Sequence, residues 1–193
     1  MRSVAVYCGS AVGNDPIYRD SATALGVELA RRGLTLVYGG GNVGLMGVVA
    51  NAVLDAGGSV IGVIPRQLAD LEMAHPGLTR LEVVETMAQR KSRMEELADA
   101  FVAMPGGIGT LEELAEVLTM QQLGLVKGPV GLLNVNGFWE TFHQALRGFV
   151  ECGFVQPRYV ESIAVEEDPA ALLESFAGWV PLGNKWAKNP IGR

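Results

Sequence analysis

Short apolar runs alternate with longer amphipathic segments along the chain, and this alternation limits its fold more than any other feature. The runs expected to be strands are residues 3–8, 34–38, 59–64, 81–84, 101–104, 129–135 and 162–165. Strands that alternate with helices form parallel sheets, and continuous apolar runs are typical of strands buried on both faces. The pattern predicts an α/β fold: a doubly wound parallel sheet with helices on both faces.

The segments between these runs carry signals for helix starts and ends. Asp15 before Pro16 indicates an N-cap, and Gly33 ends that helix after about Arg32. Thr86 and Gln89 match a capping box that opens a helix to about Ala98. Other helices are expected after the 39–47 loop to about residue 56, after the 105–110 turn to about 123, at 137–151 and at 168–177, with 65–79 irregular or a short helix. Residues 1–193 are expected to form one domain, with 180–193 as a C-terminal tail.

Composition and charge argue against two classes of partner. Apolar residues make up 49% of the chain, charged residues make up 19%, and the net charge is −6. A nucleic-acid binder usually carries a basic surface, so no nucleic-acid partner is expected. The uncharged stretch 33–54 is interrupted by glycines and asparagines, so we expect a buried strand, loop and helix there and no membrane span. Cys8 and Cys152 are the only cysteines, which indicates a reducing compartment and a cytoplasmic protein.

Glycine-rich turns follow three of the expected strands, at residues 8–10, 39–47 and 105–110. Ligands bind at the carboxyl ends of strands in such sheets. Residues 39–44 match the dinucleotide fingerprint G-x-G-x-x-G, but the next strand ends without the acidic residue that would bind a ribose. We therefore expect no nicotinamide cofactor. The turn either lets backbone amides approach a ligand or allows close packing of helix on sheet.

The turn at residues 105–110 leads directly into a helix, whose first amides can bind an anion. No P-loop lysine follows it, so a monophosphate fits better than a triphosphate. Thr110 and Glu113 also match a capping box, so Glu113 either caps its own helix or acts on a bound ribose phosphate. Glu112 is expected to face solvent.

Other chemistries find less support. Arg90 and Lys91 oppose the dipole of their helix, which a bound anion would offset, although they could equally form an ordinary solvated basic face. His75 and His143 are isolated, so no metal site is expected. Cys8 has no assignable base for nucleophilic catalysis.

Arg90-Lys91 followed by Pro105-Gly106-Gly107-Ile108-Gly109-Thr110-Leu111-Glu112-Glu113 closely resembles the LOG ("Lonely guy") family. These proteins are cytokinin riboside 5′-monophosphate phosphoribohydrolases, long mislabelled as lysine decarboxylases. The resemblance includes Cys8-Gly9-Ser10, residues 37–46 and Glu72 before Ala74-His75, and so reaches to about Gly124. Lys91 offers nothing specific for a pyridoxal Schiff base, so the decarboxylase label has little physical support.

The resemblance implies a Rossmann-like fold and a homodimer with its site near the subunit interface. It also implies hydrolysis of the N-glycosidic bond of N6-modified adenosine 5′-monophosphates to free base and ribose 5-phosphate, without a cofactor. By position, Arg90 and Glu113 are the catalytic pair. The substrate-binding residues it implies are Gly9, Ser10, Gly40, Gly41, Glu72, Met87, Arg90, Lys91, Gly106, Gly107, Ile108, Gly109, Thr110, Glu113 and Thr119.

This chemistry is reasonable for these residues. Cleavage of a ribosyl–base bond passes through an oxocarbenium-like state, which a carboxylate such as Glu113 can stabilise, or it can activate the attacking water. Arg90 would either anchor the substrate or stabilise the leaving base. Two alternatives stay open: a broader AMP or purine monophosphate nucleosidase, and a non-catalytic carrier of a nucleotide-like ligand with the same fold.

Overall fold

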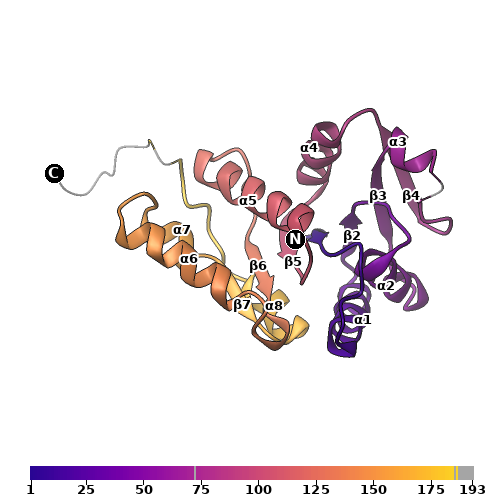
Figure 1. Cartoon of the computed structure of the whole chain (residues 1–193), viewed down its shortest axis with the longest axis horizontal. Helices are drawn as coiled ribbons and strands as arrows, with labels where there is room; N and C mark the ends of the chain where they lie inside the picture. Colours follow the sequence, from indigo (N-terminus) through magenta and orange to yellow (C-terminus); the bar gives the residue numbers. More distant parts are fainter. Residues whose placement is uncertain (72, 185, 187–193) are drawn as a thin grey trace.

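A single parallel sheet organises the chain, as the computed structural model shows for residues 1–71, 73–184 and 186 (Figure 1). Its strands lie in the order β4-β3-β2-β1-β5-β6-β7, and each neighbouring pair is parallel. The strands are β1 (Ser3–Tyr7), β2 (Thr35–Tyr38), β3 (Val60–Pro65), β4 (Arg80–Val84), β5 (Ala100–Ala103), β6 (Val130–Leu133) and β7 (Ala164–Glu166). The α/β doubly wound prediction is confirmed.

Helices connect successive strands, and two of the predicted helix starts are confirmed in detail. The Asp15 carboxylate accepts the N–H of Ile17, and the Thr86 hydroxyl accepts the N–H of Gln89, so both are N-caps. The helices are α1 (Pro16–Arg31), α2 (Gly44–Asp55), α3 (Arg66–Ala69), α4 (Met87–Leu97), α5 (Ile108–Leu123), α6 (Glu140–Glu151), α7 (Pro157–Glu161) and α8 (Pro169–Ser175), with a 3-10 turn at Val135–Gly137.

The structure corrects two of the predicted boundaries and adds one short helix. Helix α2 begins at Gly44, so the loop after β2 is shorter than expected. Gly44 has φ +60°, and a Cβ there would overlap the backbone of Ser10, so only glycine fits this abrupt helix start. A 3-10 turn stands where α6 was expected to begin, and α7 was not predicted because five residues are too few to show a helical period.

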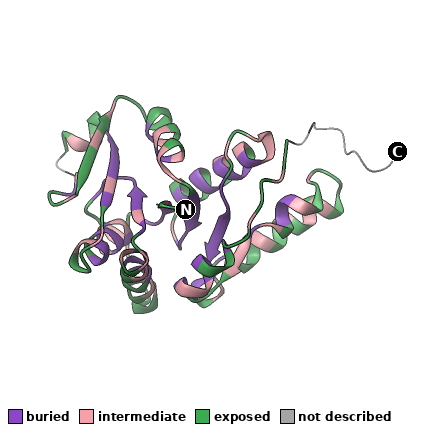
Figure 2. Ribbon diagram, turned by 180° about the vertical axis from the view of Figure 1, so that it is seen from behind, coloured by how far each residue is buried: buried purple, intermediate pink, exposed green. Residues whose placement is uncertain are grey.

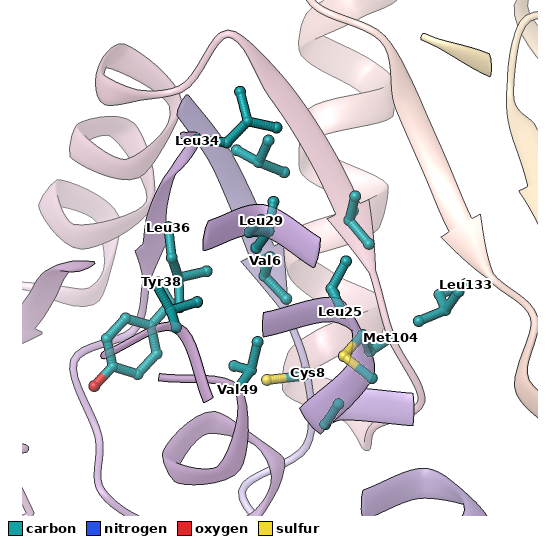
Figure 3. Close-up of a cluster of buried hydrophobic side chains, with 14 of the residues drawn as sticks. Val6, Cys8, Leu25, Leu29, Leu34, Leu36, Tyr38, Val49, Met104 and Leu133 are labelled. Carbon is teal, nitrogen blue, oxygen red and sulfur yellow. The ribbon is translucent and has the colours of Figure 1, made fainter. Parts of the chain in front are cut away.

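Two apolar layers cover the sheet, and Figure 2 shows buried residues along the central strands, whereas the edge strand β4 is largely exposed. On one face α1, α2 and α8 pack against the sheet, and part of this layer, including Leu25, Leu29 and Val49, is drawn in Figure 3. On the other face Met94 of α4 and Leu114 of α5 pack against Phe101. The helices that carry Arg90 and Glu113 therefore lie on the same face of the sheet.

The strand order reverses between β1 and β5, which are direct neighbours with Tyr7 opposite Ala103. Such a reversal leaves a crevice at the carboxyl ends of the two strands, where ligands bind. The turns after β1 and β5 therefore lie side by side at this edge.

The remaining predictions concern the chain as a whole. Among the described residues, no helix has both the length and the apolarity needed to cross a bilayer. In the predicted tail, the carbonyl of Gly183 accepts a hydrogen bond from the hydroxyl of Tyr159 at 3.3 Å. Residues 185 and 187–193 of that tail lie outside the described residues, as does Glu72.

Candidate active site

Hydrogen bonds tie the three glycine-rich turns together at the carboxyl edge of the sheet. The N–H of Gly9 donates to the carbonyl of Pro105 at 3.1 Å, and the N–H of Leu45 donates to the carbonyl of Gly9 at 3.0 Å. A Cβ on Gly106 would overlap Thr110, so this glycine serves close packing. The predicted convergence of the turns after β1, β2 and β5 is confirmed.

The N-terminus of α5 is open to solvent. Gly107 is its N-cap, and no described side chain caps it. Gly107, Ile108 and Gly109 are exposed, and a Cβ built on either glycine meets no atom within 4 Å. The first N–H groups of a helix have no partner inside it, and they carry the positive end of the dipole. This end of α5 can therefore receive an anion such as a phosphate.

The capping-box interpretation of Thr110 and Glu113 is wrong. Because α5 begins at Ile108, Thr110 already lies inside the helix and is buried. Glu113 lies a further turn along and directs its carboxylate to Arg90 of α4. The carboxylate is thus available for a role outside its own helix.

Arg90 and Glu113 form a buried ion pair between α4 and α5. Nη1 of Arg90 lies 3.0 Å from Oε1 of Glu113, and the two side chains are 11% and 8% exposed. The guanidinium also packs against Gly39, where a Cβ would overlap it. Nε of Arg90 and Oε1 of Glu113 are buried and have no well-aligned hydrogen-bond partner among the described residues. Both groups keep capacity for a ligand.

Burial raises the pKa of Glu113 above the ordinary glutamate value, and the charge of Arg90 opposes this shift. The same kind of burial raises the pKa of Tyr7 on the adjacent strand β1. Little water screens the carboxylate here, so an ionised Glu113 would interact strongly with any positive charge that develops nearby.

Lys91, the next residue of α4, forms ion pairs with two other carboxylates of α5. Its Nζ contacts Oε1 of Glu112 and lies 2.6 Å from Oε2 of Glu116. The bonds to Glu112 and then Glu116 raise the pKa of Lys91, so it stays an ammonium. A Schiff base needs the neutral amine, which this setting disfavours. Glu112 is 54% exposed, as predicted for a solvent-facing residue.

The turn after β2 is held by the segment that follows Glu72. The N–H of His75 donates to the carbonyl of Gly40 at 2.9 Å, and the N–H of Asn42 donates to the carbonyl of Met73 at 3.0 Å. His75 is buried, and its Nε2 lies 3.0 Å from Oδ1 of Asn51. The turn is therefore held in place by residues 73–75, and its first glycine, Gly39, lies against the guanidinium of Arg90.

Of two further predicted binding residues, Met87 lies beside the Arg90–Glu113 pair and Thr119 lies away from it. Met87 is half-exposed, and its Sδ lies 4.0 Å from Nη1 of Arg90. Thr119 is nine residues beyond Thr110 on α5, which places it about 13 Å along the helix axis. Its hydroxyl donates to the carbonyl of Ala115 and faces a groove beside α6. Within one chain, Thr119 is not brought to the turn.

An apolar cavity beside the turn was not anticipated from the sequence. It has a volume of about 290 Å³ and is lined by Tyr18, Leu45, Phe138 and the backbone of Gly9 and Gly106, among others. Tyr18 and Phe138 meet edge to face, with ring centroids 6.2 Å apart. The one sequence signal for this cavity was the position of Phe138, which follows β6. Because β6 is the neighbour of β5, the segment after it lies near the turn after β5.

Nucleophilic catalysis by a cysteine is disfavoured. Cys8 is buried among apolar side chains, including Val49 (Figure 3), and burial raises the pKa of its thiol. A thiol in such a setting is a poor nucleophile. Within the described part of the chain, no three His, Cys, Asp or Glu side chains lie together as a metal site would require.

Comparison with known proteins agrees with the sequence motifs. The family model described as "Possible lysine decarboxylase" matches residues 46–176. The rice (Oryza sativa subsp. japonica) cytokinin riboside 5′-monophosphate phosphoribohydrolase LOG is 45% identical over 188 residues, which cover 96% of this chain and 78% of that protein. The Arabidopsis thaliana enzyme LOG1 of the same description is 42% identical, covering 99% of this chain and 92% of its own.

A solved structure shares the fold. The X-ray structure of TM1055 superposes with a TM-score of 0.70 at 26% identity, covering 90% of this chain and 97% of that one. The fold, the paired motifs and the identity to relatives along nearly the whole length agree. The chain therefore belongs to the LOG family of cytokinin riboside 5′-monophosphate phosphoribohydrolases.

Proposed function

We propose that this chain hydrolyses the N-glycosidic bond of N6-modified adenosine 5′-monophosphates, releasing the free base and ribose 5-phosphate. The observation that carries the proposal is the buried Arg90–Glu113 pair beside the open N-terminus of α5. Relatives described as enzymes of this activity are 42–45% identical to the chain. A binding protein without catalysis would not require a desolvated carboxylate next to its phosphate site.

The reaction adds one water molecule across the bond between the ribose C1′ and the base nitrogen. As that bond breaks, positive charge develops on the sugar and negative charge on the base. Glu113 carries the negative charge that stabilises the sugar cation or takes the proton of the attacking water, and that proton ends on the base. Arg90 holds Glu113 and offers a positive charge to the substrate or to the leaving base.

The 5′-phosphate would bind at the amides of α5. Gly107 and Gly109 leave that approach open because neither carries a side chain. We also assign to the substrate pocket the other residues that the resemblance implies: Gly9, Ser10, Gly40, Gly41, Glu72, Met87, Gly106, Ile108, Thr110 and Thr119. The adjoining cavity gives room for part of the ribosyl phosphate.

We also propose that the functional unit is a homodimer. Helix α6 contributes no buried residue, although Phe142 and Leu146 line a groove against α5 and Phe149 is 50% exposed. Phe154, just beyond α6, is 87% exposed. An apolar surface of this kind on a well-packed protein indicates a protein partner, and in this proposal a second copy covers it and approaches Thr119.

The oligomeric state can be measured by light scattering coupled to size-exclusion chromatography. We expect the wild-type chain to have twice the monomer mass and Phe149→Asp to shift toward the monomer. Val27→Asp is a matched control, because Val27 is 46% exposed on α1, away from this groove. A monomeric wild-type chain would disprove the dimer.

The two cysteines remain free thiols in the structure, which suits a reducing compartment. On this ground we propose that the protein acts in the cytoplasm.

The activity is tested by incubating the protein with N6-isopentenyl-AMP, AMP and the matching unphosphorylated ribosides, and by following free base by chromatography. We expect base from N6-isopentenyl-AMP and little from the ribosides. Equal release from AMP would indicate the broader purine monophosphate nucleosidase. Release from the ribosides at the same rate would contradict the phosphate site. No base from any monophosphate, with binding retained, would indicate a carrier.

A further inference from the structure

Two successive residues of α4 form ion pairs with different carboxylates of α5, so two links join the helices. Arg90 pairs with Glu113, while Lys91 pairs with Glu112 and Glu116, which lie one turn apart. The Arg90 link is part of the proposed reaction centre. The Lys91 link lies beside it and has no part in the chemistry described so far.

The surroundings of Lys91 do not suit a phosphate ligand. Its side chain is 15% exposed, and its ammonium lies between two carboxylates. A phosphate dianion at Nζ would meet the negative charges of Glu112 and Glu116 and would have to displace at least one of them. The open amides of α5 offer the same anion a position without this repulsion.

The surroundings do suit a mechanical role. Side chains, both charged and apolar, span the space between α4 and α5, whose backbones are not closely packed. Glu116 is 26% exposed, so its ion pair with Lys91 at 2.6 Å is partly shielded from water, and its buried Oε2 has no well-aligned hydrogen bond among the described residues that would hold it elsewhere. If this bond were lost, α4 could shift relative to α5, and the contact between Arg90 and Glu113 would shift with it.

We infer that Lys91 is a positioning residue that, together with Glu116, fixes the spacing of α4 and α5 and so holds Arg90 against Glu113. The inference rests on the proposed function. It differs from the role implied by resemblance, in which Lys91 contacts the substrate.

The test compares Lys91→Met, Lys91→Arg, Glu116→Gln and the double variant Lys91→Met/Glu116→Gln with the wild-type chain. The measurements are kcat and KM for N6-isopentenyl-AMP and the inhibition constant of ribose 5-phosphate, which probes the phosphate site alone. Arg31→Met is the matched control, because it removes an exposed ion pair with Glu28 on α1. Hydrogen exchange of residues 87–97 and 108–116 reports on the two helices without any turnover.

For a positioning role we expect Lys91→Met to lower kcat about ten- to a hundredfold, as small displacements of reacting groups do. The inhibition constant of ribose 5-phosphate should stay within about twofold. Glu116→Gln should act in the same way, and the double variant should be no worse than the worse single variant, because both remove one link. Lys91→Arg should recover most of kcat.

A weaker inhibition by ribose 5-phosphate with kcat preserved would overturn the inference and make Lys91 a phosphate ligand. Unchanged kinetics in both single variants would overturn it too. If the wild-type chain releases no base, the proposed function fails by itself. The link is then judged by hydrogen exchange, which should increase in both helices for Lys91→Met and not for Arg31→Met; no increase would refute it.

Discussion

The guanidinium of Arg90 occupies the space into which any side chain on Gly39 would have to project. Gly39 directly follows β2, and Arg90 lies on α4, so this contact joins the sheet edge to the helix that carries the reaction centre. Gly39 does not have the positive φ seen at Gly40, so the need for glycine here is set by Arg90 and not by the backbone.

Gly39→Ala should therefore displace Arg90 and lower kcat by about tenfold or more, with a small loss of stability. Steady-state kinetics and a thermal melt measure both effects. In a chain that already carries Arg90→Ala, adding Gly39→Ala should change kcat little, because the group it displaces is gone. An equal drop in both backgrounds would show that Gly39 acts through something other than Arg90.

Glu113→Gln should lower kcat by about 10²- to 10⁴-fold while the protein stays folded, because the amide keeps the volume but neither the charge nor the basicity. Glu113→Ala should in addition lower the free energy of unfolding by about 3–5 kcal/mol, since it leaves Arg90 buried without a partner. Urea unfolding separates the two variants. Full activity of the Gln variant would remove Glu113 from the mechanism.

The acid side of the pH profile should report the raised pKa of Glu113. Burial raises this pKa above 4.5, and the reaction needs the carboxylate, so activity should fall as pH decreases through a value above 4.5. The dependence of kcat/KM on pH reports the ionisation of groups in the free enzyme, so its midpoint on the acid side gives this pKa. A midpoint at or under 4.5 would contradict the desolvated setting of this group.

Gly109→Ala should separate stability from substrate binding. Gly109 lies in the first turn of α5 without positive φ, so alanine should raise stability by up to about 0.5–1 kcal/mol. The new methyl group would project into the open space in front of the helix N-terminus, so KM for the monophosphate should rise. Gly148→Ala in α6, where a Cβ also meets nothing within 4 Å, is the control for stability alone. An unchanged KM would place the phosphate elsewhere.

Glu95 should make stability depend on pH. Burial, and then the charge of Glu116, raise its pKa to about 6. A carboxyl group whose pKa is raised by folding favours the folded state below its unfolded pKa, and this contribution is lost as pH rises through about 6. The melting temperature of Glu95→Gln should therefore gain on that of the wild type between about pH 4.5 and 6.5. A constant difference across this range would contradict the shift.

The sequence predicted what depends on local signals. The N-caps Asp15 and Thr86 follow from residues within one turn of each other. The apolar runs placed the strands within two residues of their observed bounds. The convergence of glycine turns followed from a general rule about parallel sheets. The pair Arg90 and Glu113 came from matched motifs, and their contact could not be calculated from spacing alone.

What the sequence could not supply depends on contacts between distant segments. Thr110 and Glu113 have the spacing of a capping box, but the helix begins earlier, at Ile108, because the glycine turn needs no side-chain cap. The cavity wall joins Tyr18 to Phe138, which no periodic pattern relates. Lys91 looked like a solvated or anion-binding cation, and only the packing of α4 beside α5 shows its two carboxylate partners.

Because β1 and β5 are neighbours in the sheet but far apart in the sequence, the centre of the sheet can form only late in the synthesis of the chain. Tyr7 and Ala103 pair in the sheet, so β1 has an unpaired edge until β5 has been synthesised and has folded beside it. Helix α5 comes later still, and with it Glu113. A nascent chain therefore has no catalytic pair while it is shorter than this point, and during that time its exposed strand edge is a site for mispairing with other chains.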